Sequence, residues 1–271
     1  MRGCRVLIIG GGGTWGKRYT ETLKEFFPDV DYRVVGRDWY KELDHPYDGV
    51  VITTPPETHI EIASECLLME RPIMIEKPLA LSLNDCKRLK MLQSAIDVPI
   101  IINHIHLFSH QHQRLKDSIK DPIISIRTYG CSNGPIRNYN SLYDYGPHDV
   151  SIILDLVGRM PESVKVTKSA KSVLADPLCE IFNIEIDFGS FKSLSTVGNG
   201  APGKMRMTTV KTTTGQYNSA SVEGDPPPLM CSISSFIRAV KAHRDDKAYS
   251  CPSGLSFAIM VQSILDACQQ S

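Results

Sequence analysis

Residues 5–19, RVLIIGGGGTWGKRY, join a short apolar run to a cluster of glycines and then to a helical pattern. The run at 5–9 is typical of a buried parallel strand. After it, Gly11, Gly13 and Gly16 have the GxGxxG spacing. Glycine permits a tight turn and lets backbone N–H groups approach a pyrophosphate at the start of a helix. The stretch therefore predicts a strand–turn–helix unit that binds a dinucleotide.

Strands and helices alternate from this unit to about residue 121. We expect further strands at 32–36, 49–54, 72–76 and 98–106. We expect helices from about Lys17 to the residue before Pro28, at 60–70 and at 83–95. This alternation is typical of a parallel, doubly wound sheet, so the first part of the chain is predicted to be a Rossmann domain.

The pattern changes beyond residue 121. In EIFNIEIDFG (180–189), apolar residues alternate with polar ones. A period of two predicts a sheet with one covered face and one open face, as in antiparallel sheets. The fold class is therefore α/β, with a Rossmann domain at 1–121 and a second α/β domain with an open, mostly antiparallel sheet at 122–271.

Composition excludes several classes of function. The 271 residues include 30 basic and 30 acidic side chains, a balance that gives no electrostatic basis for binding nucleic acid or an anionic membrane. No apolar stretch approaches the ~18 residues of a membrane span. The N-terminal apolar run leads into glycines without a cleavage-site pattern, which indicates a strand and not a signal peptide. Eight scattered cysteines without a CxxC pair favour reduced thiols in a cytoplasmic protein.

The residues after the second strand bear on the choice of cofactor. NAD-binding folds usually carry an acid there, which binds the ribose 2′-hydroxyl. This chain has Gly36 and then Arg37, whose guanidinium can pair with a 2′-phosphate. The sequence favours NADP. NAD stays possible, because Asp38 could bind the ribose 2′-hydroxyl in place of the usual acid.

Several further motifs resemble one family. TPPETH (54–59), IEKPLALS (75–82), DYGPH (144–148) and the late stretch PLMCSISSFIRAVKAH are similar to segments of the glucose–fructose oxidoreductase/inositol dehydrogenase (Gfo/Idh/MocA) family. The EKP motif is the most specific of them. Two positions depart from the family pattern: Tyr19 stands where a histidine often follows the glycine loop, and Ser151 where an acid often follows the motif histidine.

The resemblance implies an activity and a site. Members oxidise or reduce a secondary alcohol or ketone of a sugar, nucleotide-sugar or cyclitol with a nicotinamide cofactor, between a Rossmann domain and a second domain whose open sheet often mediates oligomerisation. We expect Lys77, Asp144 and His148 to be catalytic, with Lys77 and His148 handling the proton in an order that stays open. Asp144 and His148, four residues apart, share one helix face, and histidine titrates in the useful pH range.

The remaining expectations concern binding. The residues predicted to bind the cofactor are Gly11, Gly13, Thr14, Trp15, Gly16, Arg37, Thr54, Pro55, His59 and Glu76. Those predicted to contact the substrate are His104, His106, Arg137 and Tyr145. A homo-oligomer formed through the second sheet is the only macromolecular partner expected. An alternative is a regulatory protein that kept the fold and the cofactor but lost the chemistry.

The stretch INHIHLFSHQH (102–112) holds four of the eight histidines and raises a metal-dependent enzyme as a third alternative. His104 and His106 alternate along the last Rossmann strand, so both are expected at the rim of a substrate pocket. Ser109 is expected to cap a following helix with His110 and His112 on its surface. Histidines placed in this way do not converge on one ion, so no metal site is predicted.

Overall fold

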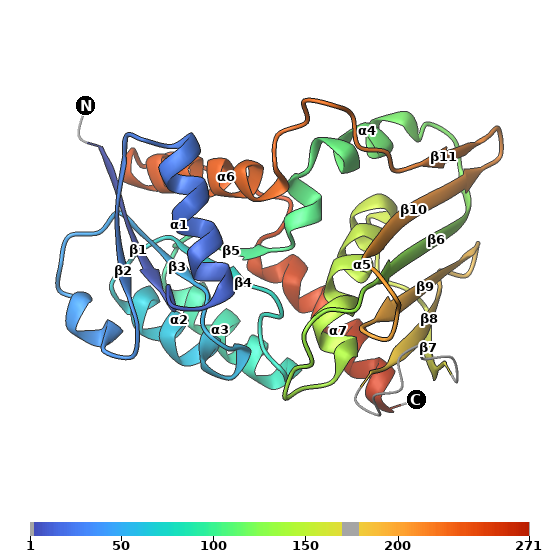
Figure 1. Cartoon of the computed structure of the whole chain (residues 1–271), viewed down its shortest axis with the longest axis horizontal. Coiled ribbons are helices and arrows are strands. Elements are labelled where there is room, and N and C mark those ends of the chain that lie inside the picture. Colours follow the sequence, from blue (N-terminus) through green and yellow to red (C-terminus); the bar gives the residue numbers. More distant parts are fainter. Residues whose placement is uncertain (1–2, 170–178, 271) are drawn as a thin grey trace. The chain divides into compact units, whose positions relative to one another are not determined.

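The structure is a computed structural model that describes residues 3–169 and 179–270 (Figure 1). The chain forms two compact units. The first comprises Met1–Phe108 and Pro226–Ile259, and the second comprises Ser109–Asp225 and Met260–Ser271. The sequence predicted one continuous boundary near Asp121 instead. The segment Pro226–Ile259 belongs to the first unit, and a long-range return of this kind leaves no local signal in the sequence.

A parallel sheet of five strands, in the order β2-β1-β3-β4-β5, forms the centre of the first unit. Its strands are β1 (Cys4–Ile9), β2 (Val30–Val35), β3 (Gly49–Ile52), β4 (Ile73–Glu76) and β5 (Ile100–Asn103). The strand order reverses direction after β1, as in a doubly wound sheet. The predicted Rossmann fold is confirmed.

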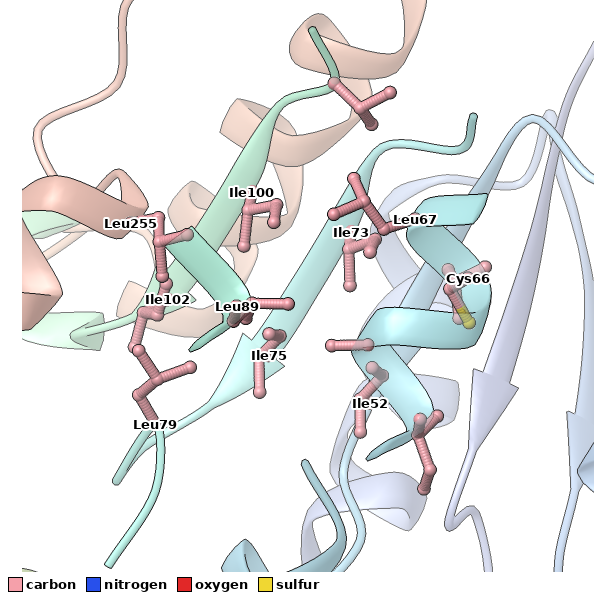
Figure 2. Packing of buried hydrophobic residues seen from close by; sticks show 14 of the residues in the cluster. Ile52, Cys66, Leu67, Ile73, Ile75, Leu79, Leu89, Ile100, Ile102 and Leu255 are labelled. Carbon is pink, nitrogen blue, oxygen red and sulfur yellow. The ribbon is translucent and has the colours of Figure 1, made fainter. Parts of the chain in front are cut away.

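Helices cover both faces of this sheet (Figure 1). On one face lie α1 (Thr14–Phe26) and α6 (Pro228–Arg244), and on the other lie α2 (His59–Leu68) and α3 (Leu83–Ala95). Three short 3₁₀ helices also connect the elements: η1 (Trp39–Glu42), η2 (Pro56–Thr58) and η3 (Ile105–Phe108). The core between the sheet and α2 and α3 is aliphatic (Figure 2). Alternate residues of β4 and β5, such as Ile73, Ile75, Ile100 and Ile102, are buried against Leu67 and Leu89.

The last strand of this sheet is shorter than predicted. β5 ends at Asn103, and η3 begins at Ile105. The alternation proposed for His104 and His106 is therefore wrong, because the two residues follow the strand. The apolar run VPIII resembles the start of a longer strand, but the backbone N–H of Leu107 donates to the carbonyl of His104 and tightens the chain into a helical turn.

The second unit contains a mixed sheet of six strands in the order β11-β10-β6-β9-β8-β7. These strands are β6 (Ile123–Cys131), β7 (Ser163–Lys168), β8 (Ile181–Asp187), β9 (Lys192–Gly198), β10 (Met205–Thr212) and β11 (Gln216–Asn218). Among the described strands of this sheet, only β6 and β9 pair in parallel, so the sheet is mostly antiparallel, as predicted. Helix α5 (Ser141–Val157) packs on one face, and α4 (His110–Ser118) contacts β11. Helix α7 (Leu255–Gln270) starts in the first unit and ends in the second.

The amphipathic pattern at 180–189 is confirmed. Ile184 and Ile186 are fully buried, whereas Asn183, Glu185 and Asp187 of the same strand are partly exposed. The sheet therefore has one covered face and one that carries polar and exposed side chains. No helix of the described residues is long and apolar enough to cross a membrane. None of the eight cysteines, all of which lie in the described residues, forms a disulfide.

Candidate functional site

The glycine loop makes a turn that other residues could not make. Gly10 follows β1 with a φ of 94°, a left-handed conformation. A Cβ atom on Gly11 would lie 1.8 Å from the Val34 side chain, and one on Gly16 would lie 2.3 Å from the Gly11 Cα atom. These glycines therefore let α1 approach β1 and β2 closely. Gly12, by contrast, is exposed, and an added Cβ there would meet no described atom within 4 Å.

The start of α1 faces open space. Gly13 is the N-cap and Thr14 the first helical residue; both are exposed, and no side chain in the described part of the chain caps this end. The first N–H groups of a helix attract anions. Trp15 is half-buried, with the Arg18 guanidinium 4.9 Å from its ring centroid. The loop thus has the open cradle of backbone donors that a pyrophosphate needs.

The residues after β2 are accessible. Gly36, Arg37 and Asp38 are all exposed, directly after the end of this strand. Asp38 has partners of its own on η1: its Oδ1 lies 3.6 Å from the Lys41 Nζ and 3.5 Å from the Tyr40 hydroxyl. Both cationic and anionic groups are therefore available at the position where a cofactor ribose is expected.

The TPPETH segment after β3 is held by His59. Its Nδ1 lies 3.0 Å from the Pro78 carbonyl oxygen and its Nε2 lies 2.8 Å from that of Thr54. The ring is buried, and burial lowers the pKa of His59. This side chain thus ties the ends of β3 and β4 together, while Thr54 is half-buried and Pro55 exposed. His59 therefore holds the shape of the loop by binding two backbone carbonyl groups. The sequence motif did not indicate this role.

Lys77 follows β4 directly and is half-buried, at the carboxyl end of the parallel sheet where ligands bind in such folds. The preceding Glu76 is buried, and its Oε1 accepts hydrogen bonds from the Tyr19 hydroxyl at 2.9 Å and the Asn103 Nδ2 at 2.7 Å. Its carboxyl is thus engaged inside the first unit. Tyr19 and Asn103 were not predicted as functional residues, although strand register places Asn103 directly beside Glu76.

His104 is buried next to Ser253. The Ser253 hydroxyl donates to the Ile102 carbonyl at 2.6 Å, so it accepts from the His104 Nδ1–H at 2.8 Å. Burial, together with the charge of Lys77, lowers the pKa of His104 to about 3. The imidazole is therefore neutral, with its Nε2 carrying a lone pair. His104 lies nearer the core than the predicted rim, whereas His106 on η3 is half-buried.

The histidines of α4 differ from each other. Ser109 caps the helix as predicted, accepting from the His112 N–H at 3.2 Å, and His110 is exposed. The prediction of a surface position for His112 is wrong: its ring is buried, and its Nε2 donates to Asp155 Oδ2 at 2.6 Å. The turn of α4 that carries His112 faces α5. The sequence of this helix is so polar that its periodicity did not indicate a buried side. Among the described residues, no group of three or more histidine, cysteine or acidic side chains could hold a metal.

In the second unit, Asp144 and His148 lie one turn apart on α5, as predicted. The Asn140 side chain caps the helix by accepting from the Leu142 N–H at 2.8 Å. Asp144 is buried, and its Oδ2 is 3.4 Å from the Arg137 Nε. His148 is half-buried. Arg137 and Asp144 therefore come together, although they belong to a loop and a helix.

A polar pocket of about 360 Å³ surrounds this pair within the second unit. It is lined by Arg137, Asn138, Tyr139, Asn140, Ser141, Asp144, Glu180 and Asn199. Amide, carboxylate and guanidinium groups of this kind can bind the hydroxyls of a polyol. Tyr145 lies on the same helix, half-buried, with its hydroxyl 3.0 Å from the Ser132 Oγ, and burial raises its pKa. Tyr145 thus holds the loop after β6.

The residue after His148 anchors α5 to the sheet. Asp149 is fully buried and pairs with the Arg206 guanidinium of β10 at 2.7 Å. A Cβ atom on Gly130 would lie 2.2 Å from the Asp149 carboxylate, so glycine at that position makes room for the pair. This ion pair fixes the rotation of the helix that carries Asp144 and His148. Sequence reasoning did not identify Arg206, because its partner lies 57 residues away.

Comparison with known proteins shows what the first unit and the longer chain resemble. Residues 31–104 match the oxidoreductase family with an NAD-binding Rossmann fold, GFO_IDH_MocA. The scyllo-inositol 2-dehydrogenase (NADP(+)) of Bacillus subtilis is 24% identical over 197 residues, which make up 68% of this chain and 54% of that protein. Rhizopine catabolism protein MocA of Rhizobium meliloti is 23% identical over 182 residues, 62% of this chain and 57% of that protein. The matched region thus spans about half the length of these relatives. Residues 31–104 thus match the Gfo/Idh/MocA family, and over 197 residues the chain is similar to an inositol dehydrogenase.

Solved structures share the fold over nearly the whole chain. GenD2 from gentamicin A biosynthesis, in complex with NAD, has a TM-score of 0.84 at 20% identity, covering 100% of this chain and 94% of that one. The scyllo-inositol dehydrogenase of Lactobacillus casei, with NAD(H) and scyllo-inositol, has a TM-score of 0.81 at 15% identity, covering 99% and 96%. Both units of the chain therefore share the fold of these proteins.

Proposed function

We propose that this protein is an NAD(P)-dependent oxidoreductase that transfers a hydride between nicotinamide and a secondary alcohol or ketone of a sugar, nucleotide-sugar or cyclitol. The observation that carries the proposal is the pairing, on one sheet, of an open glycine loop with a half-buried lysine at the end of β4. Two relatives are named as acting on or binding scyllo-inositol, which supports a polyhydroxylated substrate.

The residues of the first unit fit a dinucleotide. The uncapped start of α1 at Gly13 and the open space beside Gly12 suit a pyrophosphate. Thr14, Trp15, Thr54 and Pro55 flank this loop in sequence or follow the neighbouring strand, and we propose that they complete the site. Bound nicotinamide would accept or deliver a hydride at the substrate carbon that carries the oxygen. We propose that His59 and Glu76 support the site from within and do not touch the cofactor.

We further propose that Lys77 and His148 handle the proton that accompanies the hydride. Oxidation of an alcohol releases the hydroxyl proton to a base, and reduction needs an acid to return it. Asp144, held by Arg137, would orient the substrate or the imidazole. The polar pocket beside Asp144 offers hydrogen bonds to hydroxyl groups, and its two carboxylates against one guanidinium favour uncharged polyols.

The first experiment is a turnover assay. The purified protein is mixed with NADP or NAD and a panel of sugars, cyclitols and their keto forms, and nicotinamide absorbance is followed. We expect turnover of at least one polyol and a loss of kcat of about a thousandfold in Lys77→Ala, since the variant lacks a group that transfers the proton. Lys90→Ala on α3 serves as the control. Absence of turnover together with tight cofactor binding would support a regulatory protein instead.

The second experiment tests the preference for NADP. We propose that Arg37 pairs with the 2′-phosphate, because Gly36 leaves room and Asp38 is engaged with Lys41. Arg37→Ala should weaken NADP binding about tenfold to a hundredfold, since a charge-assisted hydrogen bond is lost, and should leave NAD binding nearly unchanged. Isothermal titration with each cofactor measures both constants. Equal losses for the two cofactors would contradict this role.

A further inference from the structure

Asn199, in the polar pocket of the second unit, has its side-chain amide held in one orientation. The residue lines the pocket, although it is only 3% exposed. Its Oδ1 accepts a hydrogen bond from the Glu180 backbone N–H at 2.8 Å, and its backbone N–H donates to the Glu180 carbonyl oxygen at 3.1 Å. The Asn199 Nδ2 group donates to no atom of residues 3–169 and 179–270, the ranges that the structure describes.

The contact with Glu180 determines which end of the amide is left for a ligand. A backbone N–H can only donate, so the amide atom that faces it must be the oxygen. The Nδ2 group of Asn199 is then the end without a partner in the described part of the chain. A buried amide donor that stays unbonded destabilises a fold, and an acceptor oxygen of a bound molecule would satisfy it.

The backbone beside Asn199 is shaped to hold the amide in this place. Gly198, the last residue of β9, has a φ of 153°, which L side chains rarely adopt, and a Cβ atom there would lie 2.0 Å from the Glu180 carbonyl oxygen. Glycine therefore lets the end of β9 approach the residue before β8 closely enough for both bonds between Asn199 and Glu180. The Ser141 hydroxyl also donates to the Glu180 carbonyl oxygen, at 3.3 Å, which holds the first turn of α5 at the same point.

The charges of the pocket favour an uncharged ligand that is rich in hydroxyl groups. The Glu180 carboxylate pairs with the Lys168 ammonium at 2.8 Å, and the Asp144 carboxylate lies 3.4 Å from the Arg137 Nε. Each acid of the pocket thus has a basic partner. A hydroxyl group can accept a hydrogen bond from an amide N–H and donate its own proton to a carboxylate. The pocket offers both kinds of partner, with an amide donor on Asn199 and carboxylate acceptors on Glu180 and Asp144.

We propose that Asn199 is a substrate-binding residue that determines specificity: its Nδ2 group donates a hydrogen bond to one hydroxyl oxygen of an uncharged polyol or sugar ring held in this pocket. The proposal rests on the proposed function, in which the substrate is a sugar, nucleotide-sugar or cyclitol. An amide donor at this place suits a hydroxyl oxygen and not an ammonium group, which has no lone pair with which to accept.

Direct binding of polyols tests this role. The full chain is titrated with scyllo-inositol, myo-inositol and D-glucose by isothermal titration calorimetry, with and without NADP. Asn199→Asp is the main variant, because its carboxylate can still accept from the Glu180 N–H but has no N–H to donate. Asn199→Ala removes the donor without adding a charge. Asn183→Asp is the matched control, since this asparagine of β8 accepts from the Thr196 hydroxyl at 2.8 Å and does not line the pocket.

We expect both Asn199 variants to raise the dissociation constant of the bound polyol about tenfold, because one hydrogen bond to a hydroxyl oxygen is lost. Asn183→Asp should keep the constant within about twofold of the unaltered protein. In turnover, the Asn199 variants should raise KM about tenfold and keep kcat within about threefold, because the hydrogen bond is present both in the bound substrate and in the transition state.

An unchanged dissociation constant in the Asn199 variants overturns the proposal, as do an equal loss in Asn183→Asp and a failure of all three polyols to bind the unaltered protein. Thermal unfolding identifies an Asn199 variant that does not fold, and the other one then decides. Calorimetry requires no catalysis. Binding that depends on Asn199 without any turnover therefore supports this inference and refutes the proposed function, whereas turnover with an unchanged KM in the variants does the reverse.

Discussion

His104 is held in a single tautomer by two successive hydrogen bonds. Because the Ser253 hydroxyl donates to a backbone carbonyl, it can only accept from the imidazole. Ser253 is 149 residues away in the sequence and belongs to the segment that returns to the first unit. The sequence predicted His104 at the rim of a substrate pocket, whereas the structure has a buried, neutral imidazole held in one orientation.

This arrangement predicts that His104 does not titrate near neutral pH. Its pKa of about 3 lies far below the usual value because the charged ring would be buried. In ¹⁵N NMR spectra of histidine-labelled protein, the His104 signals should keep the Nδ1–H pattern from about pH 5 to pH 8. Ser253→Ala should yield a mixture of tautomers and lower the free energy of unfolding by about 1 kcal/mol. A midpoint within that pH range would contradict the assignment.

At the scale of elements, side chains of α4 anchor that helix to its neighbours. His112 and Lys116 both donate to Asp155 of α5, at 2.6 and 2.9 Å, and Arg114 forms two hydrogen bonds with Asp225. The helix is short and strongly polar, so its apolar contacts alone do not hold it in place. Charge pairing therefore determines where α4 lies in the second unit.

The pairing predicts a dependence of stability on pH. Burial alone would raise the pKa of Asp155, but the hydrogen bonds and charges of His112 and Lys116 outweigh it and lower the pKa. A carboxyl whose pKa is lowered by folding stabilises the protein above the ordinary value of about 4, and this contribution is lost as the pH falls below it. Asp155→Asn should thus lower the free energy of unfolding at pH 7 by about 2 kcal/mol, and by less near pH 3.

Urea unfolding at the two pH values measures this difference. Asp31→Asn is a suitable control, because its carboxylate is 69% exposed and pairs with Arg5 on the surface. Exposed pairs contribute little, so the control should change stability by less than about 0.5 kcal/mol at either pH. A loss in Asp155→Asn that is equal at both pH values would show that the side chain acts by packing and not by charge.

At the scale of the whole molecule, the second sheet has an outer face with exposed apolar side chains. Alternate residues of β9 and β10 leave Leu194, Met205 and Met207 exposed among charged side chains. Register places Thr128 and Tyr129 of β6 between these two strands, so the exposed residues belong to one continuous sheet. An open sheet with apolar groups on its outer face is suited to pack against another copy.

We predict that the protein forms a homo-oligomer through this face. The double variant Leu194→Glu/Met207→Glu should dissociate it, because four or more buried carboxylates would face one another across a symmetric interface. Light scattering coupled to gel filtration measures the mass. Met91→Glu on α3 is the control, since that methionine is 74% exposed outside the sheet. A monomer of the unaltered protein at about 10 μM, a typical working concentration, would contradict the prediction.

The sequence alone determined the Rossmann sheet, the open second sheet and the position of the glycine loop. Those features depend on local patterns, namely the apolar run at 5–9 and the period of two in 180–189. The glycine loop also depends on local sterics, because Gly11 and Gly16 leave the room that a helix needs to approach a strand. The EKP motif likewise placed Lys77 at a strand end, because strands end where their apolar run ends.

The tertiary structure decided which polar groups meet. Tyr19 reaches Glu76 across 57 residues, and Asp149 reaches Arg206 across the same interval. Tyr19 lies on the buried face of α1 with Gly16 and Leu23, but the partner of its hydroxyl depends on which strand lies beneath α1. The burial of His112 depends in the same way on the place of α5. The apolar pattern of an element predicts which of its faces is buried. The burial of a polar side chain such as His112, and the partner of each polar group, depend on how the elements pack, which only the folded chain defines.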